Sequence, residues 1–285
     1  MKVIYVGVFN PNSTNYAQAI GFERAGCSLI RYEYRDRARE IGVDARDSEL
    51  IQLCQQEKPD VFVIAKGNTI NARVIVECNK ITTTVLWFMD AVNAGHWNSE
   101  LQDKIIHCNH VFCDKTQAVD LGLQLNPNTH FLCEGYDSDV DTPINVPQDI
   151  KVSFIGAPYG ARASMCSAVG AKVIQGVYGL NHSRVVSRSQ INLNSCTNNC
   201  ASDRVYKILA AKGFMLTDSW YGMDKLFTAG KDFVVYTDTQ DLRTKISYYL
   251  DHPEEREVIR ANGFNSVQKY SRHQWASNII KTISS

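Results

Sequence analysis

Two stretches of the chain, VIYVG at residues 3–7 and VSFIG at residues 152–156, are built alike. Each is an apolar run that ends in glycine and leads through a loop into a segment of helical pattern. A strand, a glycine, a loop and a helix form the first unit of nucleotide-binding α/β folds, in which the loop and the start of the helix face the ligand. Neither loop carries the G-x-G-x-x-G pattern, yet the recurrence of the unit predicts two related domains.

The rest of the chain extends both units in the same manner. Strand-like and helix-like segments alternate almost throughout, which is typical of parallel sheets covered by helices. Residues 134–150 lack this alternation and are rich in Asp, Pro and Asn, so they mark a domain boundary. We therefore expect an α/β protein with two Rossmann-like domains, residues 1–140 and 141–285, that face each other across a cleft. Strands are expected at residues 3–9, 28–34, 60–65, 83–89, 111–113 and 129–133, and at 151–156, 172–178, 191–194, 214–217 and 233–236.

The composition is that of a globular protein. With 285 residues, of which 44% are hydrophobic and 21% charged, the chain is long enough for two domains that each bury a core. The apolar runs are too short to span a bilayer, and the first residues lack the small-residue cleavage site of a signal peptide. We expect a protein of the cytoplasm (the host cytoplasm if the source is viral) that has no membrane partner.

The cysteines also indicate a reducing compartment. The nine residues are odd in number and scattered through segments that are expected to be strands and helices, unlike a disulfide framework. Two spacings resemble a metal site loosely, Cys196-x3-Cys200 and the His and Cys residues of positions 107–113. Neither has the paired C-x2-C pattern of structural zinc, so we expect no bound metal.

Charge is divided unevenly between the two halves. Residues 1–150 contain 13 Lys and Arg against 20 Asp and Glu, a net charge of −7, whereas residues 151–285 contain 17 against 10, a net +7. A basic half suits an anionic ligand, for which a nucleotide diphosphate is the obvious candidate. The alternative is that opposite charges merely help the two halves to face each other.

The ends of the predicted strands in the first half carry three groups of candidate site residues. Asp90 ends an apolar strand and is a candidate general base for an acceptor hydroxyl, although an Asp there can also cap the next turn. His96 is a weaker rival for the same role. Asn10 and Asn12 follow the first strand, where they either line the acceptor or phosphate side of the site or belong to the cap of the next helix.

The second half resembles a known family of enzymes. The residues that carry the likeness are SDRVYKILAAKGFMLTD at 202–218, then LF-x2-GKD at 226–232 and YYL-x2-PEER at 248–256. Weaker echoes lie at 154–156 with Arg162, at 189–194 and at 86–90. Together they resemble the CgeB-like (spore-maturation-protein-like) group of GT-B glycosyltransferases. The resemblance implies a GT-B fold, a nucleotide-sugar donor that we expect to be UDP-linked, no cofactor and no obligatory metal, and a C-terminal helix that returns to the first domain.

The donor-binding residues are expected at the starts of two helices. Arg204 is placed to hold a diphosphate by two parallel hydrogen bonds, unless an ordinary surface carboxylate pairs with it. Gly156 and the loop 157–161 offer backbone N–H groups for a phosphate, unless they form a plain turn between strand and helix. The resemblance adds Arg162 and Asp218 to the donor-binding set.

One residue departs from the family pattern. Ser202 or Asp203 is expected to cap the helix that begins near Arg204. Where the family usually carries a Glu that is expected to hold the donor ribose, this chain has Lys207, which cannot accept hydrogen bonds from the two hydroxyls. Either another residue binds the ribose, or Lys207 reaches a phosphate instead, or the chain has lost activity.

These observations predict a hexosyl- or pentosyltransferase that moves a sugar from a nucleotide-diphosphate donor to an acceptor hydroxyl. The acceptor is a polysaccharide, a protein, a metabolite or a modified DNA base. A phage-type enzyme acting on hydroxymethylated DNA is the named alternative, although the net −7 of the first half argues against a DNA-binding surface there. A sugar-nucleotide-binding or assembly protein without catalysis is the alternative of another class, and the Lys207 substitution is its best support. An oxidoreductase is disfavoured because the glycine fingerprint is missing.

Overall fold

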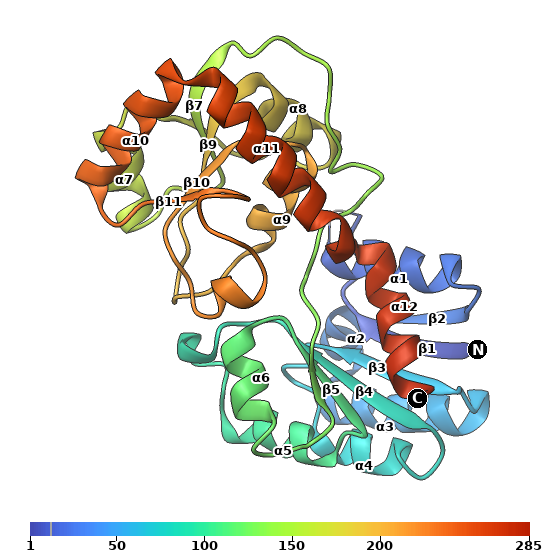
Figure 1. The fold of residues 1–285 in the computed structure, drawn as a ribbon. Helices are drawn as coiled ribbons and strands as arrows, with labels where there is room; N and C mark the ends of the chain where they lie inside the picture. The colour runs from blue at the N-terminus through green and yellow to red at the C-terminus, as the bar shows by residue number, and fades with distance from the viewer. Residues whose placement is uncertain (12) are drawn as a thin grey trace. The chain divides into compact units, whose positions relative to one another are not determined.

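A computed structural model describes residues 1–11 and 13–285 (Figure 1), so the predicted site residue Asn12 lies outside the described residues. The chain forms two compact units. The first comprises Met1–Glu134 together with Arg272–Ser285, and the second comprises Gly135–Ser271. In the described part of the chain, no helix combines the length and the apolar character that crossing a membrane requires.

The first unit is built on a parallel sheet of six strands in the order β2-β1-β3-β4-β5-β6. All of its strand pairs run parallel, because each strand is followed by a helix that crosses over the sheet. The strands are β1 (Lys2–Gly7), β2 (Ser28–Glu33), β3 (Val61–Ala65), β4 (Thr83–Phe88), β5 (His110–Cys113) and β6 (Thr129–Phe131). The helices are α1 (Thr14–Arg24), α2 (Tyr34–Ile41), α3 (Val43–Glu57), α4 (Ala72–Cys78), α5 (Ser99–His107), α6 (Thr116–Gly122) and α12 (Arg272–Ile283), with a short 3-10 turn η1 (Val92–Ala94).

The central strands of this sheet are buried on both faces, which explains their continuous apolar runs. Successive side chains point to opposite faces, so one face carries Ile4 and Phe62 beneath α3, α4 and α5, and the other carries Tyr5 and Trp87. The second face is covered by α1 and α12, which lie side by side (Figure 1). The ring of Trp275 on α12 packs edge-on against Trp87, with ring centroids 5.3 Å apart.

A glycine lets α12 approach α1 closely. A Cβ atom on Gly21 would lie 2.9 Å from the backbone oxygen of Arg272, which is too close for any side chain. Trp275 and the neighbouring Ala276 are buried in the same apolar cluster as Phe22 of α1. The C-terminal helix therefore completes the core of the first unit.

The second unit contains a parallel sheet of five strands in the order β11-β10-β9-β7-β8. Its core lies between this sheet and the helices and is formed by residues such as Phe154, Leu193 and Leu216. The strands are β7 (Ile150–Ile155), β8 (Lys172–Ile174), β9 (Ser189–Leu193), β10 (Met215–Thr217) and β11 (Val234–Val235). The helices are α7 (Ala161–Ala168), α8 (Leu180–Arg188), α9 (Asp203–Ala210), α10 (Thr239–Asp251) and α11 (Pro253–Val267), with 3-10 turns η2 (Met223–Lys225) and η3 (Gln268–Tyr270).

The two sheets share one topology. In both, the first strand of the unit lies between the second and the third, followed by the fourth and fifth in sequence order; the first sheet adds β6. This is the doubly wound, flavodoxin-like order, whose strand order reverses between the first and third strands. The predicted α/β class with two Rossmann-like sheets is confirmed. Ligands bind outside the carboxyl ends of the strands at such a reversal, which directs attention to the loops after β1, β3, β7 and β9.

Candidate active site

Two arginines meet at the reversal point of the second sheet. Arg162 comes from α7, which follows the loop after β7, and Arg204 comes from the first turn of α9, which follows the loop after β9. Both guanidinium groups lie over the ring of Phe154, at 6.0 Å for Arg162 and 4.9 Å for Arg204. The topology thus brings together two positive charges that are 42 positions apart in the sequence.

Arg204 is held in place by neutral acceptors. Its Nε donates to the backbone oxygen of Ile155 at 2.7 Å, and its Nη1 donates to Asn194 Oδ1 at 3.1 Å. Neither a partner for Nη2 nor a carboxylate that pairs with this side chain is found among the residues that the structure describes, so the alternative of an ordinary surface ion pair is not observed. The guanidinium is fixed but keeps donors for an anion.

Gly156 is required where it stands. Its φ of +139° is in the region that favours glycine, and a Cβ atom there would lie 2.7 Å from Arg204 Nη2. Any side chain would therefore push the guanidinium away from the end of β7. The sequence assigned Gly156 to a phosphate-binding loop, and the structure adds that it makes room for Arg204.

Arg162 is buried and also holds the backbone of the loop after β9. Its Nε and Nη2 both donate to the backbone oxygen of Ser195, at 3.1 and 2.8 Å, and its guanidinium lies 4.8 Å from the exposed ring of Tyr159. Burial, and after it the charge of Arg162, lowers the pKa of Arg204. Each charge destabilises the other, so an anion bound beside them would be favoured by both.

Asp218 holds the loop that follows β9. Its Oδ1 accepts from the backbone N–H of Cys196 at 2.7 Å, and its Oδ2 accepts from the hydroxyl of Ser195 at 3.2 Å. Burial, and then the charge of Asp218, raises the pKa of Cys196 to about 12, which keeps that thiol protonated at neutral pH. Both carboxylate oxygens of Asp218 are therefore engaged with the loop, and its contact with a donor would be indirect.

The residue before α9 has a hydroxyl that is not used for capping. Ser202 occupies the N-cap position, with extended backbone, but its side chain makes no cap hydrogen bond. The predicted capping by Ser202 is therefore wrong, because the hydroxyl points elsewhere: its oxygen is buried and has no partner in the described part of the chain. This hydroxyl remains to be satisfied by a ligand or by water.

Lys207 pairs with Asp203 one helical turn before it, with Nζ 2.5 Å from Oδ2. An acidic residue four positions before a lysine suits the helix dipole, so this pair stabilises α9. Nearby lies His182, a buried residue of α8 that sequence reasoning did not identify. Burial, and then the charge of Lys207, lowers the pKa of His182 to about 4, so the imidazole is neutral at physiological pH.

Asp90 forms an ion pair in the first unit. It follows β4, and its Oδ1 lies 2.8 Å from Nζ of Lys66, which directly follows the adjacent strand β3. Its Oδ2 is buried and lacks a hydrogen-bond partner within the described residues. Sequence reasoning did not identify Lys66, although a lysine that directly follows an apolar strand was a visible signal.

The other candidates of the first unit lie on exposed loops. Asn10 is exposed, and its backbone oxygen accepts from Ser13 in the turn before α1. Ser13 caps α1 by accepting from the N–H of Tyr16, so one part of the segment does belong to a helix cap. His96 is exposed after η1. A cavity of about 780 Å³ opens at the amino ends of β3 to β6, at the opposite edge of the sheet from Asp90.

A known protein family matches the second unit and the C-terminal helix. Residues 143–283 match the profile of a family described as glycosyl transferase-like. The matched part is similar to domains of this family. It contains Gly156, Arg162, Arg204, Lys207 and Asp218. No curated protein matches the sequence at a significant level.

Solved structures share the fold of the chain. HepE from Anabaena, in complex with UDP-glucose, has a TM-score of 0.72 at 9% identity, over 100% of this chain and 99% of HepE. Sucrose-phosphate synthase from Thermosynechococcus elongatus has a TM-score of 0.72 at 9% identity, over 100% and 98% of the two chains. The N-terminal domain of trehalose-6-phosphate phosphatase from Candida albicans has 0.70 at 8%, over 99% and 96%. The predicted GT-B fold is confirmed, and at these identities the likeness concerns the fold alone.

Proposed function

We propose that the chain is a glycosyltransferase whose donor is a nucleotide-diphosphate sugar, in the first instance a UDP-sugar. The observation that carries the proposal is the pair Arg162 and Arg204 at the reversal point of the second sheet, beside Ser202, whose buried hydroxyl has no partner among the described residues. Fixed donors that no carboxylate of the described residues neutralises suit a diphosphate, whose negative charge grows as it leaves. That HepE, of the same fold, was solved with UDP-glucose supports the choice of nucleotide.

In the proposed reaction, the bond between the anomeric carbon and the diphosphate oxygen breaks, and a bond from the acceptor oxygen to that carbon forms. The leaving nucleotide diphosphate takes the bonding electron pair and is stabilised by Arg204, Arg162 and the N–H groups of α9. Asp90 accepts the proton of the acceptor hydroxyl. Because Oδ2 of Asp90 is buried, the proton goes to Oδ1, the oxygen that lies 2.8 Å from Nζ of Lys66.

The finer assignments belong to the same proposal. They are membership of the CgeB-like group, transfer of a hexose or pentose, independence from metal, action in the cytoplasm, and an acceptor that is a polysaccharide, protein, metabolite or modified DNA base. Residues 1–140 would receive the acceptor and residues 141–285 the donor. The net charge of −7 in residues 1–150 favours an acceptor other than DNA.

A second candidate is a protein that binds sugar nucleotides without catalysis. Lys207, where the resemblance expects a carboxylate, is engaged with Asp203, and Asp90 is engaged with Lys66. Purified protein separates the two candidates, because many transferases slowly hydrolyse their donor. Incubation with a panel of nucleotide sugars should release the nucleotide diphosphate from at least one donor. Binding of a donor, seen as a raised melting temperature, without any hydrolysis or transfer would favour the binding protein.

A further inference from the structure

The loop between β3 and α4, residues 66–71, has an unusual backbone. Lys66 and Gly67 both adopt the left-handed conformation, with φ of +62° and +60°. Gly67 has no substitute, because a Cβ atom there would lie 2.5 Å from Ile64 Cγ2. Lys66, however, is a residue that rarely adopts this conformation and is strained by it. Such strain persists only where the surroundings impose it, and it is found preferentially at functional sites.

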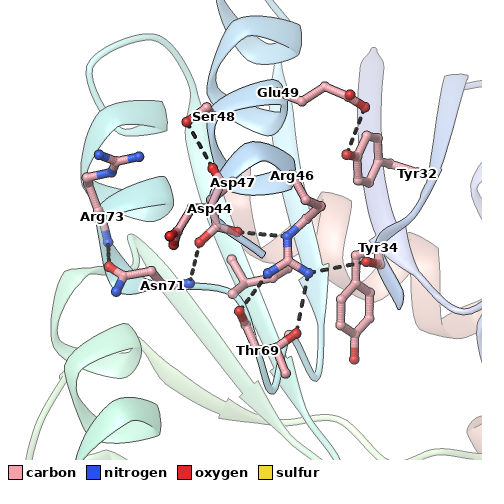
Figure 2. A network of polar contacts seen from close by, with 12 residues as sticks. Tyr32, Tyr34, Asp44, Arg46, Asp47, Ser48, Glu49, Thr69, Asn71 and Arg73 are labelled. Atoms are coloured by element: carbon pink, nitrogen blue, oxygen red, sulfur yellow. Dashed lines mark hydrogen bonds and ion pairs between the residues drawn. The ribbon is translucent and has the colours of Figure 1, made fainter. Parts of the chain in front are cut away.

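Two buried charges hold the middle of this loop (Figure 2). Arg46 is fully buried; its Nη2 donates to the backbone oxygen of Thr69 at 2.6 Å, and its Nη1 reaches the hydroxyl of Thr69 and the backbone oxygen of Tyr34. Asp47 accepts from Nε of Arg46 at 2.8 Å through one oxygen. Its other oxygen accepts from the backbone N–H of Asn71 at 3.0 Å. The pair thus holds both Thr69 and Asn71.

A third buried charge holds the two flanks of the loop. Lys104 on α5 is 2% exposed, and its Nζ donates to the backbone oxygens of Gly67 at 2.7 Å and of Ile70 at 3.2 Å. Burial lowers the pKa of this lysine, which shows the cost of placing the charge there. The backbone oxygens of Gly67, Thr69 and Ile70 each receive a donor from a buried cation.

Stability alone does not explain three buried charges. Replacing buried ion pairs by apolar side chains of similar volume is often neutral or stabilising, so such groups are kept where they fix a geometry. The outer side of the loop borders a cavity of about 390 Å³. The hydrogen bonds of Arg46, Asp47 and Lys104, together with the buried side chain of Ile70, fix the path of this backbone.

The course of this loop determines the position of Lys66. Its N–H donates to the backbone oxygen of Trp87 at 2.9 Å, which anchors it to β4, and its Nζ lies 2.8 Å from Oδ1 of Asp90. We propose that Lys66 is a positioning residue for the carboxylate of Asp90, presented in a strained conformation by the buried network of Arg46, Asp47 and Lys104. This inference rests on the proposed role of Asp90 as the base. Nζ of Lys66, 2.8 Å from Oδ1, holds the carboxylate by its charge and so fixes where Oδ1 meets the acceptor.

The chain offers a matched control for this idea. Lys58 is also a left-handed lysine, with φ of +46°, but it ends α3 at the opposite edge of the sheet from Asp90. Lys66→Gly and Lys58→Gly relieve the same backbone strain, and only the first removes the partner of Asp90. Lys66→Arg keeps the positive charge, and Lys66→Asn tolerates the left-handed backbone if the glycine variant does not fold.

The experiment measures UDP release from UDP-glucose, UDP-galactose or UDP-N-acetylglucosamine, whichever the wild-type protein hydrolyses, together with the melting temperature. We expect both glycine variants to melt no lower than wild type. Lys66→Gly should lower kcat by about 10²-fold, the scale for misplacing a reacting group by about 1 Å, with KM for the donor unchanged. Lys58→Gly should leave kcat unchanged, and Lys66→Arg should recover most of it.

The outcomes separate this inference from the function on which it rests. If Asp90→Asn abolishes turnover while Lys66→Gly and Lys66→Asn keep kcat within about twofold of wild type, Lys66 does not position Asp90, and the proposed base stands. If Asp90→Asn itself keeps normal turnover, the proposed base is wrong. If the wild-type protein hydrolyses none of the three donors, the proposed transfer from UDP-sugars and this inference both fail.

Discussion

Replacing Arg204 by alanine tests the donor site most directly. The side chain is fixed by Ile155 and Asn194, and no carboxylate neutralises it in the described parts of the chain, 1–11 and 13–285. A hydrogen bond to a charged group contributes about 1.5–3 kcal/mol. Loss of one such bond to the diphosphate therefore raises the Kd for UDP by about 10- to 150-fold. The assay is calorimetric titration of UDP into the wild-type and Arg204→Ala proteins.

The same substitution has a second, opposite effect that makes the test stricter. Removing Arg204 deprives Ile155 and Asn194 of a donor, which destabilises the fold, but it also removes a largely buried cation that repels Arg162. Because these contributions oppose each other, we expect the melting temperature without ligand to change little. Arg188→Ala is the control, since Arg188 is a partly exposed arginine of the same unit that pairs with Asp149 at 2.5 Å. An unchanged Kd in a folded Arg204→Ala protein would refute the assignment.

Three further outcomes are expected. Asp90→Asn should lower turnover by about 10²–10⁴-fold with unchanged donor Kd, the usual contribution of a positioned proton acceptor; turnover near that of wild type would make Asp90 a structural residue. Gly156→Ala should weaken UDP binding and lower the melting temperature, because the new Cβ atom meets Arg204 Nη2 at 2.7 Å in a backbone that disfavours alanine. If the variant keeps the UDP affinity and the melting temperature of wild type, the loop has room to adjust. His182, whose pKa burial lowers to about 4, takes up a proton on unfolding between pH 4 and 6.5. The free energy of unfolding should therefore rise with pH across that window, by an amount on the order of 3 kcal/mol, and remain level above it. Denaturant melts of wild type and His182→Gln check this, since equal slopes for the two proteins would exclude His182 as the cause.

The fold was predictable from the sequence because its signals are local. The strands β1, β3, β4 and β7 are buried on both faces, so each is a continuous apolar run. Such a run stands out from the polar loops at its two ends, which makes the strand visible in the sequence. Gly156 was recognisable for the same reason, since a glycine directly after an apolar strand is typical of the turn into a nucleotide-binding helix. Arg204 followed from a motif within a single helix.

The contacts between segments were not predictable in this way. The pairing of Lys66 with Asp90 depends on β3 and β4 being neighbours, and nothing in either segment specifies the other. Asp218 was assigned to the donor, yet its oxygens engage the loop at Ser195 and Cys196, because β9 and β10 end side by side. Ser202 has the sequence of a helix cap, but the direction of a hydroxyl depends on its surroundings. Hydrogen bonds of this kind depend on the order of strands in the sheet.

The return of α12 to the first unit has a consequence for biosynthesis. The apolar face that carries Tyr5, Phe22 and Trp87 is covered by Trp275, which leaves the ribosome only after all of residues 135–271. The second unit is continuous in sequence and can fold while translation proceeds, whereas in the first unit one face of the sheet is covered only by α1 until α12 is made. During that interval the nascent chain presents an aromatic surface of the kind that chaperones bind. Shortening the chain within α12 would make that transient state permanent. A lower yield of folded protein after such a truncation would therefore report a folding defect and not a catalytic role of α12.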